Sequence, residues 1–153
     1  MHGARKMKQT VYRLEHERIA PHASLLPPPV ISFLVGKRRW RLEHAYVLNT
    51  KAHTIVVPAH FEFDLASVPR ALWWLIAPFE LSIAAPLVHD FLYHCAGQPP
   101  AGCVRPPKRF TRLETDVVFR ETMDKEGVSQ WRCAAAYRAV RWFGMWSWGR
   151  DSA

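Results

Sequence analysis

Four ionisable side chains in the second half of the chain could act together on one substrate or one metal ion. His89, Asp90 and Tyr93 stand within about one helical turn, and Asp116 follows in the next segment with helical character. His89 and Tyr93 are four residues apart, so on a helix both reach one point above its surface. Imidazole nitrogen and carboxylate oxygen bind divalent metals. The pattern therefore predicts either metal-assisted chemistry or a solvated polar helix face.

Asp116 shares its predicted helix face with apolar side chains, which indicates that its carboxylate points inward. A buried carboxylate is costly unless it is paired, and Arg112 and Arg120 stand one turn to either side as the expected partners. Two interpretations stay open. Asp116 is part of a structural ion pair, or it meets His89 and Asp90 across a helix interface to form a site.

The segment 64–70 adds a third group of polar side chains. Pro69 disfavours helix before it, so the segment is predicted to be a turn. The Ser67 hydroxyl and the Arg70 guanidinium could order this turn or bind an anion. Asp64 is either a turn-forming carboxylate or a site residue. Because Ser67 lacks the G-x-S-x-G elbow, it is not expected to be a nucleophile.

The elements that must position these groups are strands first and helices after. We expect a strand at 30–35 and a hairpin over 40–57. The first strand of the hairpin is expected to run from 40 to 48, with alternate side chains on one face. A short third strand is expected beside Phe61 and Phe63. We expect helices at 10–19, 71–76, 82–95, from Thr111 to Gly127, and at 130–146. Ser82 and Ser129 are the predicted caps, Pro86 lies in a first turn, and Thr111 with Glu114 has the capping-box spacing.

This order predicts an α+β fold, in which a small antiparallel sheet packs against about three C-terminal helices. Residues 1–29 are expected to be a basic N-terminal arm that ends in three consecutive prolines. Residues 30–148 are expected to form a single domain, and residues 149–153 a short tail.

Charge is unevenly distributed along the 153 residues, whose formal net charge is +8. Residues 1–45 carry 9 basic and 3 acidic groups, residues 46–103 carry 2 and 4, and residues 104–153 carry 10 and 6. No apolar run is long enough to span a membrane, and no secretory signal is visible, so synthesis in a cytosol is expected. The three cysteines are predicted to be reduced thiols.

Three boxes of sequence resemble a phage and prophage family that is catalogued only as a domain of unknown function. The segment from Val57 to Arg70 is similar to the family's VPxGFxTDxASxPR box, and residues 89–93 match its HDxLY box. Arg112, Asp116 and Phe119 match a third box, R…AD..F. The likeness covers roughly residues 40–145. The chain departs from the family at His60, where the family has glycine, and at Phe63, where it has threonine.

The resemblance implies a phage setting and supplies no activity. We therefore expect a component of the virion, in the tail or at the head–tail neck, that is made in the bacterial cytoplasm and docks on other phage structural proteins in an oligomeric assembly. The alternative is a metal-dependent hydrolase of cell-wall peptide or phosphoester. In it Asp64, His89, Asp90 and Asp116 would bind a divalent ion, Arg70 an anionic group, and Tyr93 would donate a proton. Nucleic-acid binding is a further option, which no recognised motif favours.

Overall fold

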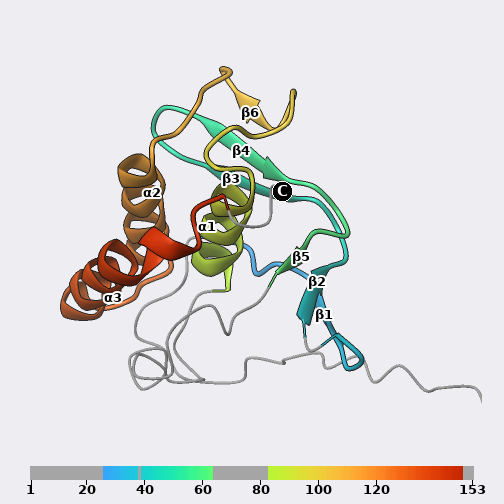
Figure 1. The fold of residues 1–153 in the computed structure, drawn as a ribbon, viewed down its shortest axis with the longest axis horizontal. Coiled ribbons are helices and arrows are strands. Elements are labelled where there is room, and N and C mark those ends of the chain that lie inside the picture. Colours follow the sequence, from blue (N-terminus) through green and yellow to red (C-terminus); the bar gives the residue numbers. More distant parts are fainter. Residues whose placement is uncertain (1–25, 38, 64–82, 150–153) are drawn as a thin grey trace, which may run out of the picture.

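The computed structural model describes residues 26–37, 39–63 and 83–149, and these form an α+β fold (Figure 1). The described strands precede the described helices, except for one short strand, as the sequence predicts. The strands are β1 (Ile31–Leu34), β2 (Arg39–Leu42), β3 (Tyr46–Asn49), β4 (Thr54–Val57), β5 (Glu62–Phe63) and β6 (Val104–Arg105). The helices are α1 (Ala84–His94), α2 (Arg112–Lys125) and α3 (Gln130–Phe143), followed by the 3-10 turn η3 (Gly144–Trp146). The helices expected at 10–19 and 71–76 lie outside the described residues.

The strands form two antiparallel sheets, with the orders β1-β2-β5 and β3-β4-β6. The single strand expected over residues 40–48 is therefore wrong, because the chain leaves the first sheet after Leu42 and enters the second at Tyr46. At the break, the Glu43 N–H donates to the Val30 carbonyl at 2.8 Å and His44 is exposed. Apolar residues stand at every second position on both sides of this bend, at 40 and 42 and at 46 and 48, with only His44 between them, so periodicity alone does not reveal it.

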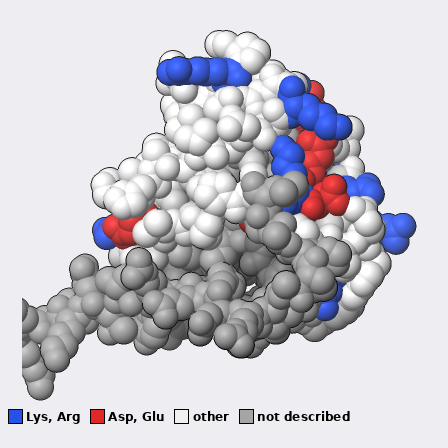
Figure 2. Space-filling view, turned by 180° about the vertical axis from the view of Figure 1, so that it is seen from behind, with Lys and Arg blue, Asp and Glu red and all other residues white. Residues whose placement is uncertain are grey.

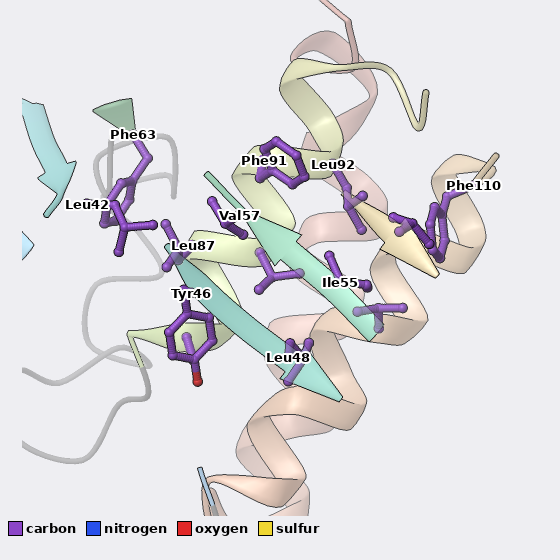
Figure 3. Packing of buried hydrophobic residues seen from close by; sticks show 14 residues of the cluster. Leu42, Tyr46, Leu48, Ile55, Val57, Phe63, Leu87, Phe91, Leu92 and Phe110 are labelled. Atoms are coloured by element: carbon purple, nitrogen blue, oxygen red, sulfur yellow. The ribbon is translucent and has the colours of Figure 1, made fainter. Parts of the chain in front are cut away.

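The main core lies between the second sheet and α1 (Figure 3). Alternate residues of β3 and β4 point to one side, where Leu48 and Ile55 meet Leu87 and Leu92 of α1, and all four are fully buried. Burial of each such side chain contributes about 1.5–3 kcal/mol relative to exposure. This packing fixes α1, and α1 in turn presents its other side to α2.

The helix ends follow the predicted caps only in part. Thr111 and Glu114 form both hydrogen bonds of the capping box at the start of α2, as expected. The N-cap of α1 is Ile83, which has no capping hydroxyl, so the helix starts later than the Ser82 cap predicts. Ser129 occupies the N-cap of α3, but its side chain makes no capping hydrogen bond. The three cysteines are free thiols.

His60 holds an unusual backbone conformation in the turn between β4 and β5. Its φ is +66°, in the left-handed region that glycine adopts without steric cost, and its N–H donates to the Leu42 carbonyl at 2.7 Å. This is the position at which the resembled family has glycine. The chain keeps the turn and carries the strain of a side chain there.

Candidate functional site

Asp116 is the centre of a hydrogen-bonded cluster that joins all three helices. It lies on the inner face of α2 and its side chain has no exposed surface. The His89 ring and the Tyr93 hydroxyl, both from α1, contact Oδ1 at 2.9 and 2.6 Å. The Arg141 guanidinium, from α3, donates to Oδ2 at 2.9 Å. The expectation that Asp116 points inward is therefore confirmed.

His89 and Tyr93 reach the same carboxylate oxygen because they stand one turn apart on α1. Their rings lie 4.1 Å apart between centroids, and Phe119 of α2 lies 4.9 Å from the His89 ring. Trp148 meets the Tyr93 ring edge-on at 4.9 Å. His89 and Tyr93 are both buried, so the interpretation of this face of α1 as a solvated polar surface is wrong.

Arg141 is the partner that sequence reasoning missed. We expected Arg112 and Arg120, one turn to either side of Asp116, to pair with it. Instead, Arg112 donates to the backbone carbonyl of Arg141 at 3.1 Å, and Arg120 lies over the Tyr137 ring at 5.7 Å. Arg141 is 25 residues from Asp116, and only the packing of α3 on α2 brings the two together. No local spacing in the sequence contains that information.

The electrostatics of the cluster favour an ionised Asp116 beside a charged Arg141 and neutral His89 and Tyr93 side chains. Burial opposes ionisation of Asp116, but hydrogen bonds from His89, Tyr93 and Arg141 outweigh it, and the pKa of the carboxyl is lowered. Burial lowers the pKa of His89, although Asp116 acts in the opposite direction. Burial, and then Asp116, raise the pKa of Tyr93, so this hydroxyl keeps its proton. With an acceptor opposite, the neutral imidazole carries its proton on Nε2.

The other predicted site residues are placed as follows. Asp90 follows His89 on α1 and is half-buried. We expected it to meet Asp116, but the hydrogen bonds to Asp116 come from His89, Tyr93 and Arg141. Asp64, Ser67 and Arg70 lie outside the described residues. Across residues 26–37, 39–63 and 83–149, no three His, Cys, Asp or Glu side chains are grouped so that they could hold a metal ion.

A second inward-facing carboxylate, that of the half-buried Glu126 at the C-cap of α2, is also absent from the sequence prediction. The backbone N–H groups of Ala84 and Ala85, at the start of α1, face it as hydrogen-bond donors. Its Oε2 is buried and has no hydrogen-bond partner in the described structure. Burial raises the pKa of Glu126 to about 7, against the opposite effect of the two N–H groups. A glutamate before the helix-ending Gly127 gives no sign in the sequence that it turns inward.

Outside the cluster, α3 and η3 expose several large apolar side chains. Trp142 is 80% exposed, Trp146 72% and Trp131 57%, and Met145 and Phe143 are also exposed. Trp131, Trp142 and the exposed Arg138 lie on one side of α3. Together with Met145 and Trp146 of η3, they are called the aromatic stripe below. None of the helices in the described part is long and apolar enough to cross a membrane.

Comparison with known proteins assigns a family and no activity. No curated protein and no solved structure matches the chain. One family model does match, and its match begins in β2 and ends in α3, so it covers His89, Tyr93 and Asp116 together with the second sheet. The match spans residues 40–140, which is well over half of the chain, so the chain belongs to the family described as protein of unknown function (DUF1353).

Proposed function

We propose that this protein is an accessory component of a bacteriophage particle, in the tail or at the head–tail neck, which docks on neighbouring virion subunits through the aromatic stripe. The exposure of Trp131 and Trp142 on α3, and of Trp146 on η3 directly after it, carries the proposal. Three large aromatic side chains in water are unusual for a surface without a partner, and Trp and Arg are enriched at the centres of protein interfaces. The phage setting rests on the three boxes that resemble a phage and prophage family.

In this proposal the Asp116 cluster is a structural centre. The carboxylate accepts from three donors on two other helices, and this arrangement fixes α1, α2 and α3 relative to one another. The aromatic stripe begins on α3, the helix of Arg141, and continues into η3. The cluster therefore sets the position in which α3 presents the stripe to a partner.

The described residues around Asp116 do not fit a cation. Arg141 brings a positive charge to within 2.9 Å of Oδ2, and His89 and Tyr93 direct donors at Oδ1. A metal ion bound to Asp116 would have to displace the Arg141 guanidinium from the carboxylate. The two positive charges would then repel each other at close range. This favours the structural role over the metal-dependent hydrolase, in which Asp116 would be a ligand.

Quantification of the chain in purified particles tests the proposal. Particles from a host that produces this protein should contain it at a fixed copy number relative to the major capsid protein, measured by quantitative mass spectrometry of peptides. The double variant Trp142→Ser, Trp146→Ser should reduce that copy number at least tenfold. Val47→Ser is the matched control, because Val47 is an exposed apolar residue on β3, away from the stripe. Absence of the wild-type chain from particles would overturn the proposal.

Metal analysis of the purified protein separates the proposal from the hydrolase. We expect no stoichiometric divalent ion. A bound ion that disappears in both Asp116→Ala and His89→Ala, accompanied by hydrolysis of cell-wall peptide or a phosphoester, would support the enzyme instead.

A further inference from the structure

A groove between α2 and α3 carries acidic side chains, whereas the aromatic stripe carries an arginine. Its volume is about 310 Å³, and it opens to solvent. Val117 of α2 and Tyr137 and Cys133 of α3 provide an apolar lining, and Glu121 and Asp124 of α2 add two exposed carboxylates. These five residues, together with Arg120 and Gln130, are called the α2–α3 groove. In Figure 2, charged side chains gather along the edge of the molecule that carries α2 and α3, with acidic and basic groups side by side.

The groove and the aromatic stripe lie on different sides of α3. At about 100° per residue, Trp131, Arg138 and Trp142 fall within roughly 40° of one another around the helix axis. Cys133 and Tyr137 fall about 120–160° away from Trp131. A chain therefore cannot place its own stripe in its own groove, whereas the stripe of one copy can enter the groove of another.

Charge distinguishes between the ways in which two copies could meet. α3 contains three arginines and no acidic residue, and Arg138 is the exposed arginine of the stripe. Two stripes face to face would bring Arg138 of one copy towards Arg138 of the other, which is unfavourable. The groove instead offers Glu121 and Asp124, while its own arginine, Arg120, lies over the Tyr137 ring of the same chain. Stripe against groove is the pairing in which opposite charges meet.

We infer that the aromatic stripe of this protein docks into the α2–α3 groove of a second copy of the same chain. This inference rests on the proposed function and names the neighbouring subunit. The contact is heterologous, because it joins two different surfaces, so every added copy leaves one stripe and one groove open. Such contacts close into a ring when the rotation between copies allows it and otherwise continue as a filament. Both forms suit a tail or a neck, which are built around an axis.

Self-association of single-surface variants tests the inference. Sedimentation analysis of the wild-type chain should show a mass that rises with concentration. Trp142→Ser removes the central stripe residue and Glu121→Arg reverses a groove charge. Each variant alone should stay monomeric over the same range, which corresponds to at least a tenfold weaker association. Val47→Ser, which lies outside both surfaces, should associate like the wild type.

Mixing the two variants gives the decisive result. Trp142→Ser keeps an intact groove and Glu121→Arg keeps an intact stripe, so an equimolar mixture should form dimers and nothing larger. A stripe-to-stripe contact would instead let Glu121→Arg dimerise by itself, because both of its copies keep an intact stripe, and that outcome would overturn the inference. A wild-type chain that is monomeric at every concentration would overturn it too, while incorporation into particles would still support docking on other virion proteins. Stripe-dependent binding to vesicles of phosphatidylglycerol by a chain that does not self-associate would assign the stripe to a lipid surface and would also overturn the inference.

Discussion

The replacement Glu126→Gln should make the protein more stable, and the gain should depend on pH. Glu126 is held between the end of α2 and the start of α1, where burial raises its pKa from 4.5 to about 7. A carboxyl whose pKa is raised on folding binds its proton more tightly in the native state than in the unfolded state. The stability that this proton gives is complete below pH 4.5 and is lost as the pH rises to about 7.

The size of the effect follows from the same pKa. Each pKa unit corresponds to about 1.4 kcal/mol, so the change from 4.5 to about 7 amounts to at most about 3 kcal/mol between pH 4.5 and pH 8. Glutamine is neutral at every pH, and its amide oxygen can still accept from the N–H groups of Ala84 and Ala85. The variant should therefore exceed the wild type in free energy of unfolding by about 2–3 kcal/mol at pH 8. Near pH 4.5 the difference in free energy of unfolding between the two proteins should be about 2–3 kcal/mol smaller than at pH 8.

Urea unfolding followed by far-ultraviolet circular dichroism at pH 4.5, 6, 7 and 8 measures this difference. The comparison at each pH removes the contributions of all groups that the two proteins share. Lys51→Gln, at an exposed position between β3 and β4 and outside both docking surfaces, is the control and should shift the free energy of unfolding by less than about 0.5 kcal/mol. A Glu126→Gln difference that is the same at every pH would refute the reasoning, as would an NMR titration that gives Glu126 an ordinary pKa near 4.5.

Three further substitutions test the rest of the structure, each by urea unfolding at pH 7. Asp116→Asn should lower the free energy of unfolding by about 3–5 kcal/mol, because it leaves Arg141 without its partner; a loss below about 1 kcal/mol would show that the cluster does not hold the helices. His60→Gly should raise it by about 1 kcal/mol, since glycine removes the strain of φ +66°, and a destabilised variant would contradict that account. Gly144→Ala should lower it by about 1–3 kcal/mol, because a Cβ there would lie 2.5 Å from the Tyr93 hydroxyl oxygen; unchanged stability would show that Tyr93 can move aside.

The features that sequence reasoning found are those that depend on neighbours along the chain. The capping box of Thr111 and Glu114 and the shared direction of His89 and Tyr93 follow from spacings of three and four residues. The inward direction of Asp116 also follows from a local pattern. The α+β class follows in the same way from the order of the elements.

The features that it missed depend on contacts between distant segments. Arg141 reaches Asp116 only because α3 packs on α2, and the carboxylate of Glu126 turns inward only because α2 ends beside the start of α1. The bend after Leu42 was missed for a related reason. The same alternation stands on both sides of it, interrupted only by His44. What shows the change of sheet is the pairing of β2 with β1 and β5 and of β3 with β4.

The position of Arg141 has a consequence for where this fold can be cut. The family match ends at residue 140, one residue before Arg141, and it begins at residue 40, after β1. A chain trimmed to the matched range would keep the whole of α2 but leave the ionised carboxylate of Asp116 facing a position from which the guanidinium has been removed. It would also lose Gly144 and Trp148, which lie against Tyr93. A chain trimmed to residues 40–140 should therefore have a lower free energy of unfolding than one that extends past the shared sequence to Trp148.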